Sequence, residues 1–235
     1  VEQHTHLNRG DRRQRQRGKR DRPVAKDDKR IGEGDPGPNT GGMGAVSPVP
    51  FANEAFMAKV RERIVEPTVT GLAEEKIDYR GFIFIGLMNV GGEPYVIEYN
   101  VRMGDPETEV VLPLIKSDII GLFEGIAFHS LDKYELEIDN RCAVTVVCVA
   151  GGYPGEYNKG DVINGIPADN ADEVTVFHAG TARKGDAVVT NGGRVLAVTA
   201  VGNTITRALR RSYDIVDKIN FEGKQFRRDI GKDLM

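Results

Sequence analysis

The stretch VIEYNVRMGDPETE, residues 96–109, carries the most informative pattern in this chain. In a β-strand the side chains at i and i+2 face the same side, so Glu98 and Asn100 lie together while Ile97 and Tyr99 face away. Magnesium prefers oxygen ligands and usually takes only one or two carboxylates from a protein, which leaves positions for nucleotide phosphates and water. The alternation therefore predicts a metal-binding pair at Glu98 and Asn100.

The residues that follow this pair extend the pattern. Arg102 lies on the same face if the strand continues, and a guanidinium beside a metal-bound phosphate stabilises transferred phosphoryl charge. Asp105 and Glu107 come next, in a loop shaped by Gly104 and Pro106. Glu-x-Asn alone is a weak signal, because polar and apolar residues alternate on any half-exposed sheet. The complete run is strong, and it makes Arg102, Asp105 and Glu107 the candidate catalytic residues.

A second motif, NTGGMG at residues 39–44, lies closer to the amino terminus. Glycine allows a backbone to approach a ligand closely, and successive amide groups can bind an anion. The order matches neither a P-loop nor a dinucleotide fingerprint, so a substrate cradle and a flexible connector both remain open. The candidate substrate-binding residues are Arg30, Asp35, Asn39, Thr40, Gly41, Gly42 and Gly44.

The central part of the chain predicts helices around a hairpin. Asn53 is suited to cap a helix that Pro67 kinks or interrupts, with a second helical segment reaching Glu75. Two strands, expected at 81–88 and 95–100, are joined by a glycine-containing turn, which is a hairpin signal. After the RMGDPE loop we expect one helix from about 108 to 128.

The last third of the chain changes character. Short apolar runs rich in β-branched residues alternate with glycine-rich turns, and they predict strands at 143–150, 174–177, 187–190 and 194–201. One helix is expected at 204–218. The fold class is therefore α+β. The expected organisation is a basic segment at 1–22, part of a larger domain at 23–128, and a β-rich domain at 129–235.

Composition limits the class of protein. The chain has 235 residues, 40% of them hydrophobic, and a formal net charge of −3, which suits a globular protein with small-molecule partners. No apolar run approaches the roughly 20 residues of a membrane helix, so we expect no membrane partner. The two cysteines, Cys142 and Cys148, lie too far apart in one strand to bridge each other. Unpaired thiols indicate a reducing compartment, with the cytoplasm as the expected location.

Residues 1–22 differ from everything after them, because they are rich in Arg and Lys and have only Val1 and Leu7 as apolar residues. Such a segment cannot bury enough surface to fold. A nucleic-acid-binding arm is one interpretation, since arginines contact phosphates. We favour a disordered tail or a stretch read in a shifted frame, because no aromatic residue is interleaved for base stacking.

Several stretches together resemble the glycinamide ribonucleotide synthetase (phosphoribosylamine–glycine ligase) family of the ATP-grasp superfamily. They are KRIGEGDPGPNTGGMGA at 29–45, GFIFIGLM at 81–88, VIEYNVRMGDPETE at 96–109, AGGYPGEYNKG at 150–160, VFHAGT at 176–181 and VVTNGGRVLAVTA at 188–200. The resemblance extends over nearly everything from Pro23 to the end of the chain.

This resemblance implies ATP-dependent joining of glycine to 5-phosphoribosylamine in purine biosynthesis. In the family ATP phosphorylates the glycine carboxylate, and the amine then attacks the glycyl phosphate, so catalysis rests on positioning and charge neutralisation. By resemblance Glu98 and Asn100 bind Mg²⁺ or Mn²⁺, and Arg102 with Asp105 and Glu107 lies beside the reacting phosphate. The NTGGMG loop lines the glycine and phosphoribosylamine side.

One departure from the family limits what this chain is expected to do. Family members have a Rossmann-like domain and the first part of the ATP-grasp domain before the position of Pro23, and neither is recognisable here. We expect a chain that starts inside a longer gene product, that is inactive alone, and whose missing amino-terminal half is encoded separately if the ligase is active. The alternatives are a non-catalytic remnant and a binding module with a basic nucleic-acid-contacting arm.

Overall fold

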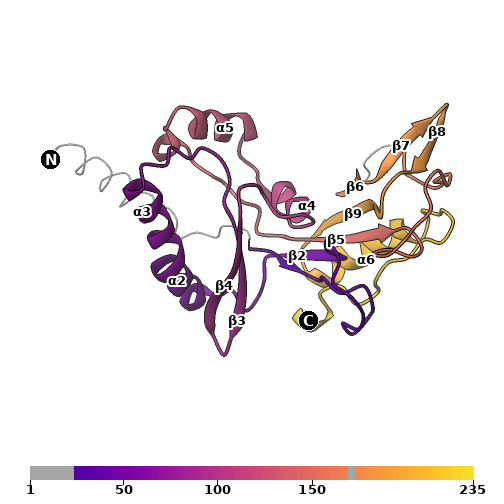
Figure 1. The fold of residues 1–235 in the computed structure, drawn as a ribbon, viewed down its shortest axis with the longest axis horizontal. Coiled ribbons are helices and arrows are strands. Elements are labelled where there is room, and N and C mark those ends of the chain that lie inside the picture. Colours follow the sequence, from indigo (N-terminus) through magenta and orange to yellow (C-terminus); the bar gives the residue numbers. More distant parts are fainter. Residues whose placement is uncertain (1–23, 169–172) are drawn as a thin grey trace. The chain divides into compact units, whose positions relative to one another are not determined.

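The computed structural model describes residues 24–168 and 173–235, which form two compact units of mixed helices and strands (Figure 1). The basic segment 1–22 lies outside the described residues, so its expected disorder stays a prediction. No described helix is long and apolar enough to cross a membrane. The chain has an α+β fold, as its sequence predicts.

The chain passes between the two units more than once. The sheet unit contains residues 25–49, 105–114 and 140–235, and the hairpin unit contains residues 50–104 and 115–139. This division differs from the single boundary expected near residue 128. The reason is that two short segments from the first half of the chain pack with the carboxy-terminal strands and not with their sequence neighbours.

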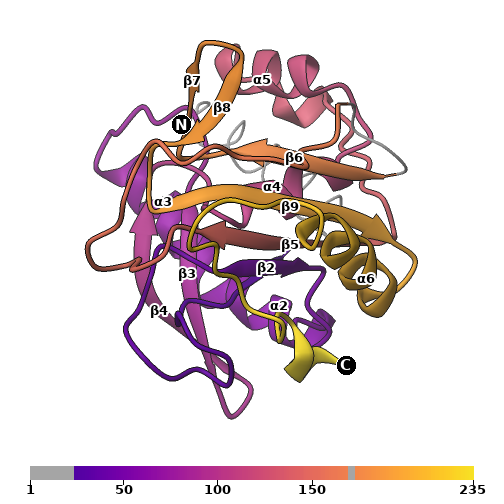
Figure 2. The ribbon, with the colours of Figure 1, turned by 90° about the vertical axis from the view of Figure 1, so that its right-hand side faces the viewer.

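The sheet unit is built on one five-stranded antiparallel sheet (Figure 2). Its order across the sheet is β1 (Lys26–Asp27), β2 (Gly44–Ser47), β5 (Cys142–Val149), β9 (Arg194–Gly202) and β6 (Val174–His178). β5 lies between β2 and β9, with Val146 opposite Gly44 on one side and Val198 on the other. Strands from distant parts of the chain are therefore direct neighbours.

Both faces of the central strands are covered. Almost every residue of β5 and β9 is buried, as expected for strands with packed material on both sides. Helix α6 (Ile205–Val216) packs against both strands, as Figure 2 shows, and α4 (Thr108–Val111) also contacts them. Thr204 caps α6, because its hydroxyl accepts a hydrogen bond of 3.2 Å from the Arg207 amide.

Smaller elements complete this unit. β7 (Thr181–Lys184) and β8 (Ala187–Thr190) form a separate two-stranded sheet, and η4 (Lys232–Leu234) is a short 3₁₀-helix near the carboxy terminus. Of these, β7 was not expected from the sequence. The four predicted strands and the helix beginning near Thr204 are confirmed to within a residue or two at their ends.

The hairpin unit contains the antiparallel pair β3 (Phe84–Val90) and β4 (Glu93–Asn100), which confirms the predicted hairpin. The connecting residues Gly91 and Gly92 have φ angles of 60° and 84°. Positive φ at both central positions is the type I′ pattern, which matches the right-handed twist of the flanking strands. The two glycines therefore set this turn.

A continuous helical run precedes the hairpin. It consists of α2 (Glu54–Val60), the π-helical segment η1 (Arg61–Val65) and α3 (Glu66–Glu74). Asn53 caps it as predicted, since its side chain accepts from the Phe56 amide at 3.0 Å. Pro67 does not end the helix. The wider π turn comes directly before it, where the missing amide of proline removes a regular helical hydrogen bond.

The expected helix from 108 to 128 is wrong. The segment forms α4, the 3₁₀ turn η2 (Leu112–Leu114) and a separate α5 (Ile119–Ala127), and a short 3₁₀ turn η3 (Leu131–Lys133) follows. Asp118 starts α5 by accepting hydrogen bonds of 3.1 and 3.3 Å from the Ile120 and Gly121 amides. A strong capping residue therefore divided an apolar pattern that looks continuous.

Candidate functional site

The predicted metal pair lies at the end of β4. The Asn100 side chain donates a hydrogen bond of 3.1 Å from Nδ2 to Oε1 of Glu98, so the two side chains are neighbours on one face, as the alternation predicts. This bond leaves the amide oxygen of Asn100 and the second carboxylate oxygen of Glu98 available. Hard oxygen donors of this kind suit Mg²⁺ or Mn²⁺.

Gly86 on β3 provides room for this pair. It is directly opposite Glu98 in the hairpin, next to a register shift between Gly86 and Leu87. A Cβ atom at residue 86 would lie 3.0 Å from Cγ of Glu98. Glycine at this position therefore lets the stem of Glu98 lie flat across the neighbouring strand. Within the described residues, no group of three or more His, Cys, Asp or Glu is placed to hold a metal ion.

Arg102 does not lie on the strand. β4 ends at Asn100, and the next residues form a bend, so the condition for a shared face with Glu98 is not met. The Arg102 guanidinium is exposed and donates to the carbonyl oxygen of Met103 at 2.9 Å. Its remaining donors stay available.

In the sheet unit, residues 31–44 form the glycine-rich loop. Arg30 and Asn39 form an isolated antiparallel bridge at its base, and Arg30 Nη1 donates to the Gly37 carbonyl at 2.7 Å. Asp35 has a φ of 65°, in the left-handed region. The exposed Asn39 side chain makes no hydrogen bond within the described part of the chain. The loop is thus a closed, internally bonded structure and not an open connector.

The backbone amides of this loop are already used. Thr40 N donates to the Lys29 carbonyl at 2.8 Å, and Met43 N to the Asp28 carbonyl at 2.8 Å. The Gly41 amide donates to the Tyr153 hydroxyl at 3.0 Å. The Gly42 amide donates to the Thr40 hydroxyl at 2.9 Å. The expectation that successive amides face an anionic ligand therefore differs from the structure, in which they bind protein acceptors.

A buried arginine anchors the outer part of the loop. Arg227 is only 2% exposed and makes a two-pronged ion pair with Asp229, at 2.8 and 2.9 Å. Its Nη1 also donates to Asp35 at 2.7 Å and to the Arg30 carbonyl at 3.0 Å. Asp35 therefore holds the loop in place, whatever further role it has.

Other residues of the same tail segment, 225–235, strengthen this attachment. Asp229 accepts from the Gly34 amide at 2.7 Å, and Glu33 accepts from the Arg228 amide at 3.0 Å. Nearer the sheet, the Gly231 amide donates to Asp28 at 3.1 Å. The tail segment thus contacts the loop through both backbone and side chains.

The loop that carries Asp105 and Glu107 meets the glycine-rich loop at Gly42. A Cβ atom at Gly42 would lie 2.3 Å from Cδ of Pro106, so only glycine fits there. Glu107 is 8% exposed, whereas the side chain of Asp105 is 54% exposed and pairs with Arg194 at 2.9 Å. Two motifs about sixty residues apart in sequence are therefore in direct contact.

Asp27 lies beneath this contact. Its side chain is 5% exposed, its Oδ2 pairs with Lys29 Nζ at 2.8 Å, and its Oδ1 would lie 2.8 Å from a Cβ at Gly42. Burial raises the pKa of Asp27 to about 7, with Lys29 opposing the rise and Glu107 and Asp28 adding to it. Burial and the nearby Asp105 also raise the pKa of Glu109.

The structure therefore contains two groups of candidate residues, each within its own unit. Glu98, Asn100 and Arg102 belong to the hairpin unit, and the glycine-rich loop lies with Asp105 and Glu107 in the sheet unit. Sequence reasoning missed Asp27, Tyr153, Arg194 and Arg227. The only sequence signal for Tyr153 and Arg194 was their position directly after glycine pairs, at 151–152 and 192–193.

Two family models match successive parts of the chain. The ATP-grasp (A) domain of phosphoribosylglycinamide synthetase matches residues 17–108, and the C domain of the same synthetase matches residues 143–233. The chain belongs to the phosphoribosylglycinamide synthetase family. The first match begins inside the basic segment 1–22 that composition sets apart.

Individual relatives of this synthetase family agree. The phosphoribosylamine–glycine ligase of Vibrio cholerae is 47% identical over 209 residues, and that of Chlorobaculum tepidum is 49% identical over 208; each match covers 88% of this chain and 49% of the relative. The crystal structure of the Thermotoga maritima ligase has a TM-score of 0.80 at 40% identity, covering 88% of this chain and 51% of that one. The chain spans about half the length of the relatives it matches.

More distant structures share the ATP-grasp fold. The biotin carboxylase domain of the Hydrogenobacter thermophilus 2-oxoglutarate carboxylase covers 78% of this chain, with a TM-score of 0.53 at 16% identity. At that identity the likeness concerns the fold alone.

The anchoring of the loop by Arg227 can be tested with its neighbour as a control. Arg227→Met should lower the free energy of unfolding by about 3 kcal/mol, because it leaves Asp229 without its buried partner. It should also speed amide exchange at Gly34. Arg228→Met, in which an exposed guanidinium is lost, should cost less than about 1 kcal/mol. Urea unfolding and hydrogen exchange give both measurements, and equal losses would contradict the anchoring role.

The raised pKa of Asp27 predicts a pH-dependent stability. The folded state holds the Asp27 proton up to about pH 7, whereas the unfolded chain releases it near 3.8. Protonated Asp27 therefore contributes its full stability to the fold below the pKa of the unfolded chain, near 3.8. This contribution is lost as pH rises towards the folded-state pKa of about 7. Asp27→Asn does not ionise, so it should become more stable than the wild type, by a few kcal/mol, as pH increases.

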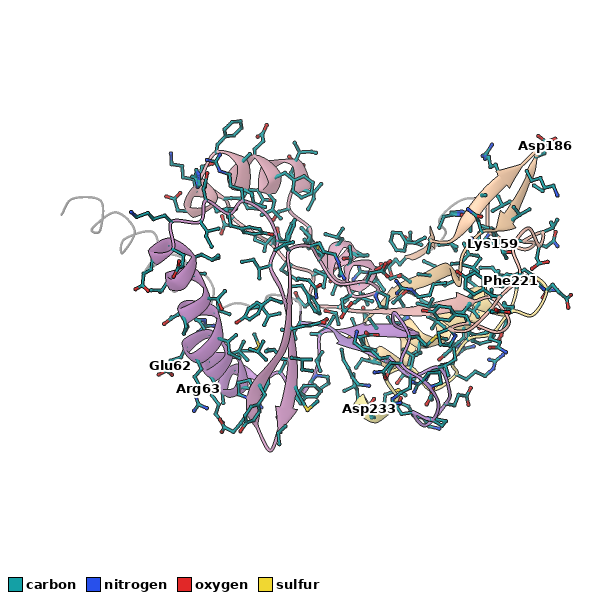
Figure 3. The ribbon with its side chains drawn as sticks, viewed as in Figure 1. Glu62, Arg63, Lys159, Asp186, Phe221 and Asp233 are labelled. Carbon is teal, nitrogen blue, oxygen red and sulfur yellow. The ribbon has the colours of Figure 1, made fainter. Side chains whose placement is uncertain are left out.

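Urea unfolding of both proteins across this pH range measures the difference. Asp233→Asn, at a carboxylate on η4 that is 59% exposed (Figure 3), is the matched control and should track the wild type. A gap between Asp27→Asn and wild type that stays constant with pH would show that Asp27 has an ordinary pKa.

Proposed function

We propose that this chain is the carboxy-terminal half of a phosphoribosylamine–glycine ligase, which joins glycine to 5-phosphoribosylamine with ATP through a glycyl phosphate. The observation that carries the proposal is the match of two successive domains of one synthetase, in the expected order, to most of the chain. The chain spans about half the length of the relatives it matches. The proposal therefore concerns one half of the active ligase.

In this proposal Glu98 and Asn100 hold Mg²⁺ or Mn²⁺ through a carboxylate and an amide oxygen. The hydrogen bond between their side chains orients both before an ion arrives. With two protein ligands, the remaining coordination positions are left for nucleotide phosphate oxygens and water. A bound ion would neutralise phosphate charge during transfer.

Arg102, Asp105 and Glu107 are proposed to act beside the reacting phosphate. Arg102 uses one donor on Met103 and keeps the others for phosphate oxygens. Asp105 and Glu107 supply negative charge that can hold the attacking amine or accept its proton. No protein nucleophile is required, because ATP itself activates the glycine carboxylate.

The glycine-rich loop is proposed to shape the substrate side. Its amides are used internally, so Gly41, Gly42 and Gly44 contribute close packing, and Thr40 contributes internal hydrogen bonds. The side chains of Arg30 and Asn39 remain exposed for a carboxylate or phosphate group. Asp35 is proposed to keep these residues in register through Arg227.

The amino-terminal half of the ligase is the proposed protein partner. β3 and β4 form a sheet of only two strands, and such a pair usually needs further strands or a packed layer for stability. Several large apolar side chains of the hairpin unit are exposed to solvent, among them Ile97 (62% exposed), Val101 (78%) and Phe128 (76%). Exposed apolar surface of this kind is typical of a surface that another polypeptide covers.

The location of the protein is proposed to be the cytoplasm. Both cysteines are free, and burial raises the pKa of Cys148 to about 12, which makes it an unreactive thiol.

We predict that this chain alone does not form glycinamide ribonucleotide. Orienting the reactants is worth roughly 7 to 11 kcal/mol of the barrier, and much of the nucleotide-orienting surface is expected in the other half. The test supplies ATP, magnesium, glycine and freshly generated phosphoribosylamine, then follows ADP and product. Addition of the part of the Vibrio cholerae ligase that this chain does not match, expressed separately, should restore turnover. Full activity of the chain alone would contradict the prediction.

The metal pair is tested in the same complemented enzyme. Replacing a residue that hydrogen-bonds to a metal ligand typically lowers metal affinity or activity by about 10–100-fold. Glu98→Gln changes a proposed ligand itself, so it should lower activity at limiting magnesium at least about tenfold. Its melting temperature should stay close to that of the wild type, because Glu98 is exposed. Glu62→Gln on η1, drawn in Figure 3, is the control and should retain activity. Normal turnover of Glu98→Gln at limiting magnesium would remove Glu98 from the site.

A further inference from the structure

Arg194 comes from a third part of the sequence and lies where the other two loops meet. It is the first residue of β9, after the turn at Gly192 and Gly193. The backbone around this turn is closely packed, because a Cβ atom at Gly193 would lie 2.2 Å from the Tyr153 ring. The Arg194 carbonyl also accepts the Gly180 amide at 2.8 Å. The position from which its side chain extends is therefore firmly set by the sheet.

One nitrogen of Arg194 contacts both loops. Nη1 donates to the Gly41 carbonyl at 2.8 Å and to the Asp105 carbonyl at 3.2 Å, and it pairs with the Asp105 carboxylate at 2.9 Å. An Nη atom has two hydrogens, so at least one of them is shared between acceptors. A lysine ammonium would keep three donors on one nitrogen but would lose the planar guanidinium that lies against Gly41.

Gly41 is held from both sides. Its carbonyl accepts from Arg194, and its amide donates to the Tyr153 hydroxyl. The guanidinium lies so close that a Cβ atom at Gly41 would be 3.0 Å from Cζ of Arg194. A side chain at this position would therefore displace the guanidinium by a few tenths of an ångström.

We propose that Arg194 is a positioning residue, which fixes the Asp105–Glu107 loop against Gly41 of the glycine-rich loop so that the two act as one substrate-side surface. The inference rests on the proposed function for its catalytic consequence. The ion pair alone contributes little to stability, because the Asp105 side chain is 54% exposed and solvent screens its charge. What the contacts do specify is the distance between two loops from distant parts of the sequence.

The positive charge of Arg194 also helps to keep Asp105 beside Gly41. Glu109 follows the loop closely, and its pKa is raised by burial and by Asp105 while Arg194 opposes the rise. Without the guanidinium, the Asp105 carboxylate would face Glu109 with no other ion-pair partner in the described part of the chain. Repulsion would then move Asp105 away from Gly41.

The first experiment uses the chain alone and needs no ligase activity. Hydrogen exchange is compared in wild type, Arg194→Gln, Arg194→Lys and the control Arg183→Gln, which changes an exposed arginine on β7. Arg194→Gln should speed exchange of the Gly41 amide and of the Val110 amide, which bonds to Glu107, each at least about tenfold. Arg194→Lys should fall between, and Arg183→Gln should match the wild type. Faster exchange in only one loop, or in neither, would overturn the inference.

The second experiment uses the complemented enzyme. Arg194→Gln should lower kcat about 100-fold, the cost expected of a displacement near 1 Å, while KM for ATP changes less than about threefold. In Arg194→Ala, added guanidinium at a sub-denaturing concentration should restore part of kcat, which a purely structural loss would not allow. An unchanged kcat, or a loss of kcat matched by loss of folded protein, would overturn the inference. Absence of turnover even in the wild type, with the exchange results as expected, would reject the proposed function and leave the positioning role standing.

Discussion

The antiparallel pairing of β2 with β5 is the constraint on which the sheet unit depends. β2 has only four residues, yet all of them are buried, and they pair with residues about a hundred positions later in the chain. Closing so long a loop costs entropy, which the buried apolar surface of Val46 and Val144 offsets. Because the glycine-rich loop connects β1 to β2, this pairing places the loop at one end of these two strands of the sheet.

Charged groups then fix the position of the glycine-rich loop. Arg227 in the tail segment holds the outer part of the loop, and Arg194 at the start of β9 holds its glycines. Each guanidinium binds backbone carbonyls as well as carboxylates, so it sets geometry as well as charge. The carboxy-terminal part of the chain therefore supplies the groups that hold the proposed substrate loop.

Local chemistry accounts for what sequence reasoning predicted well. The Gly91–Gly92 turn, the cap at Asn53, the helix start near Thr204 and the alternation at Glu98 and Asn100 each depend on residues within a few positions of one another. The predictions that failed involve either two local signals that compete or hydrogen-bond partners that are distant in the sequence. Asp118 divided an apolar pattern that predicted one helix, and the Lys29 carbonyl and the Tyr153 hydroxyl accept hydrogen bonds from loop amides that the sequence made available for a ligand.

The sequence by itself determined the family, the α+β class and the places of most strands along the chain, because these follow from periodicity and from motifs. It also predicted Glu98 and Asn100 as candidate metal ligands. Only the tertiary structure decided which acceptors the loop amides bind, that Asp27 is buried beneath Gly42, and that Arg194 joins two loops. The physical reason is that burial and hydrogen-bond partnership depend on segments brought together by folding, and a residue type does not reveal which distant group will lie beside it.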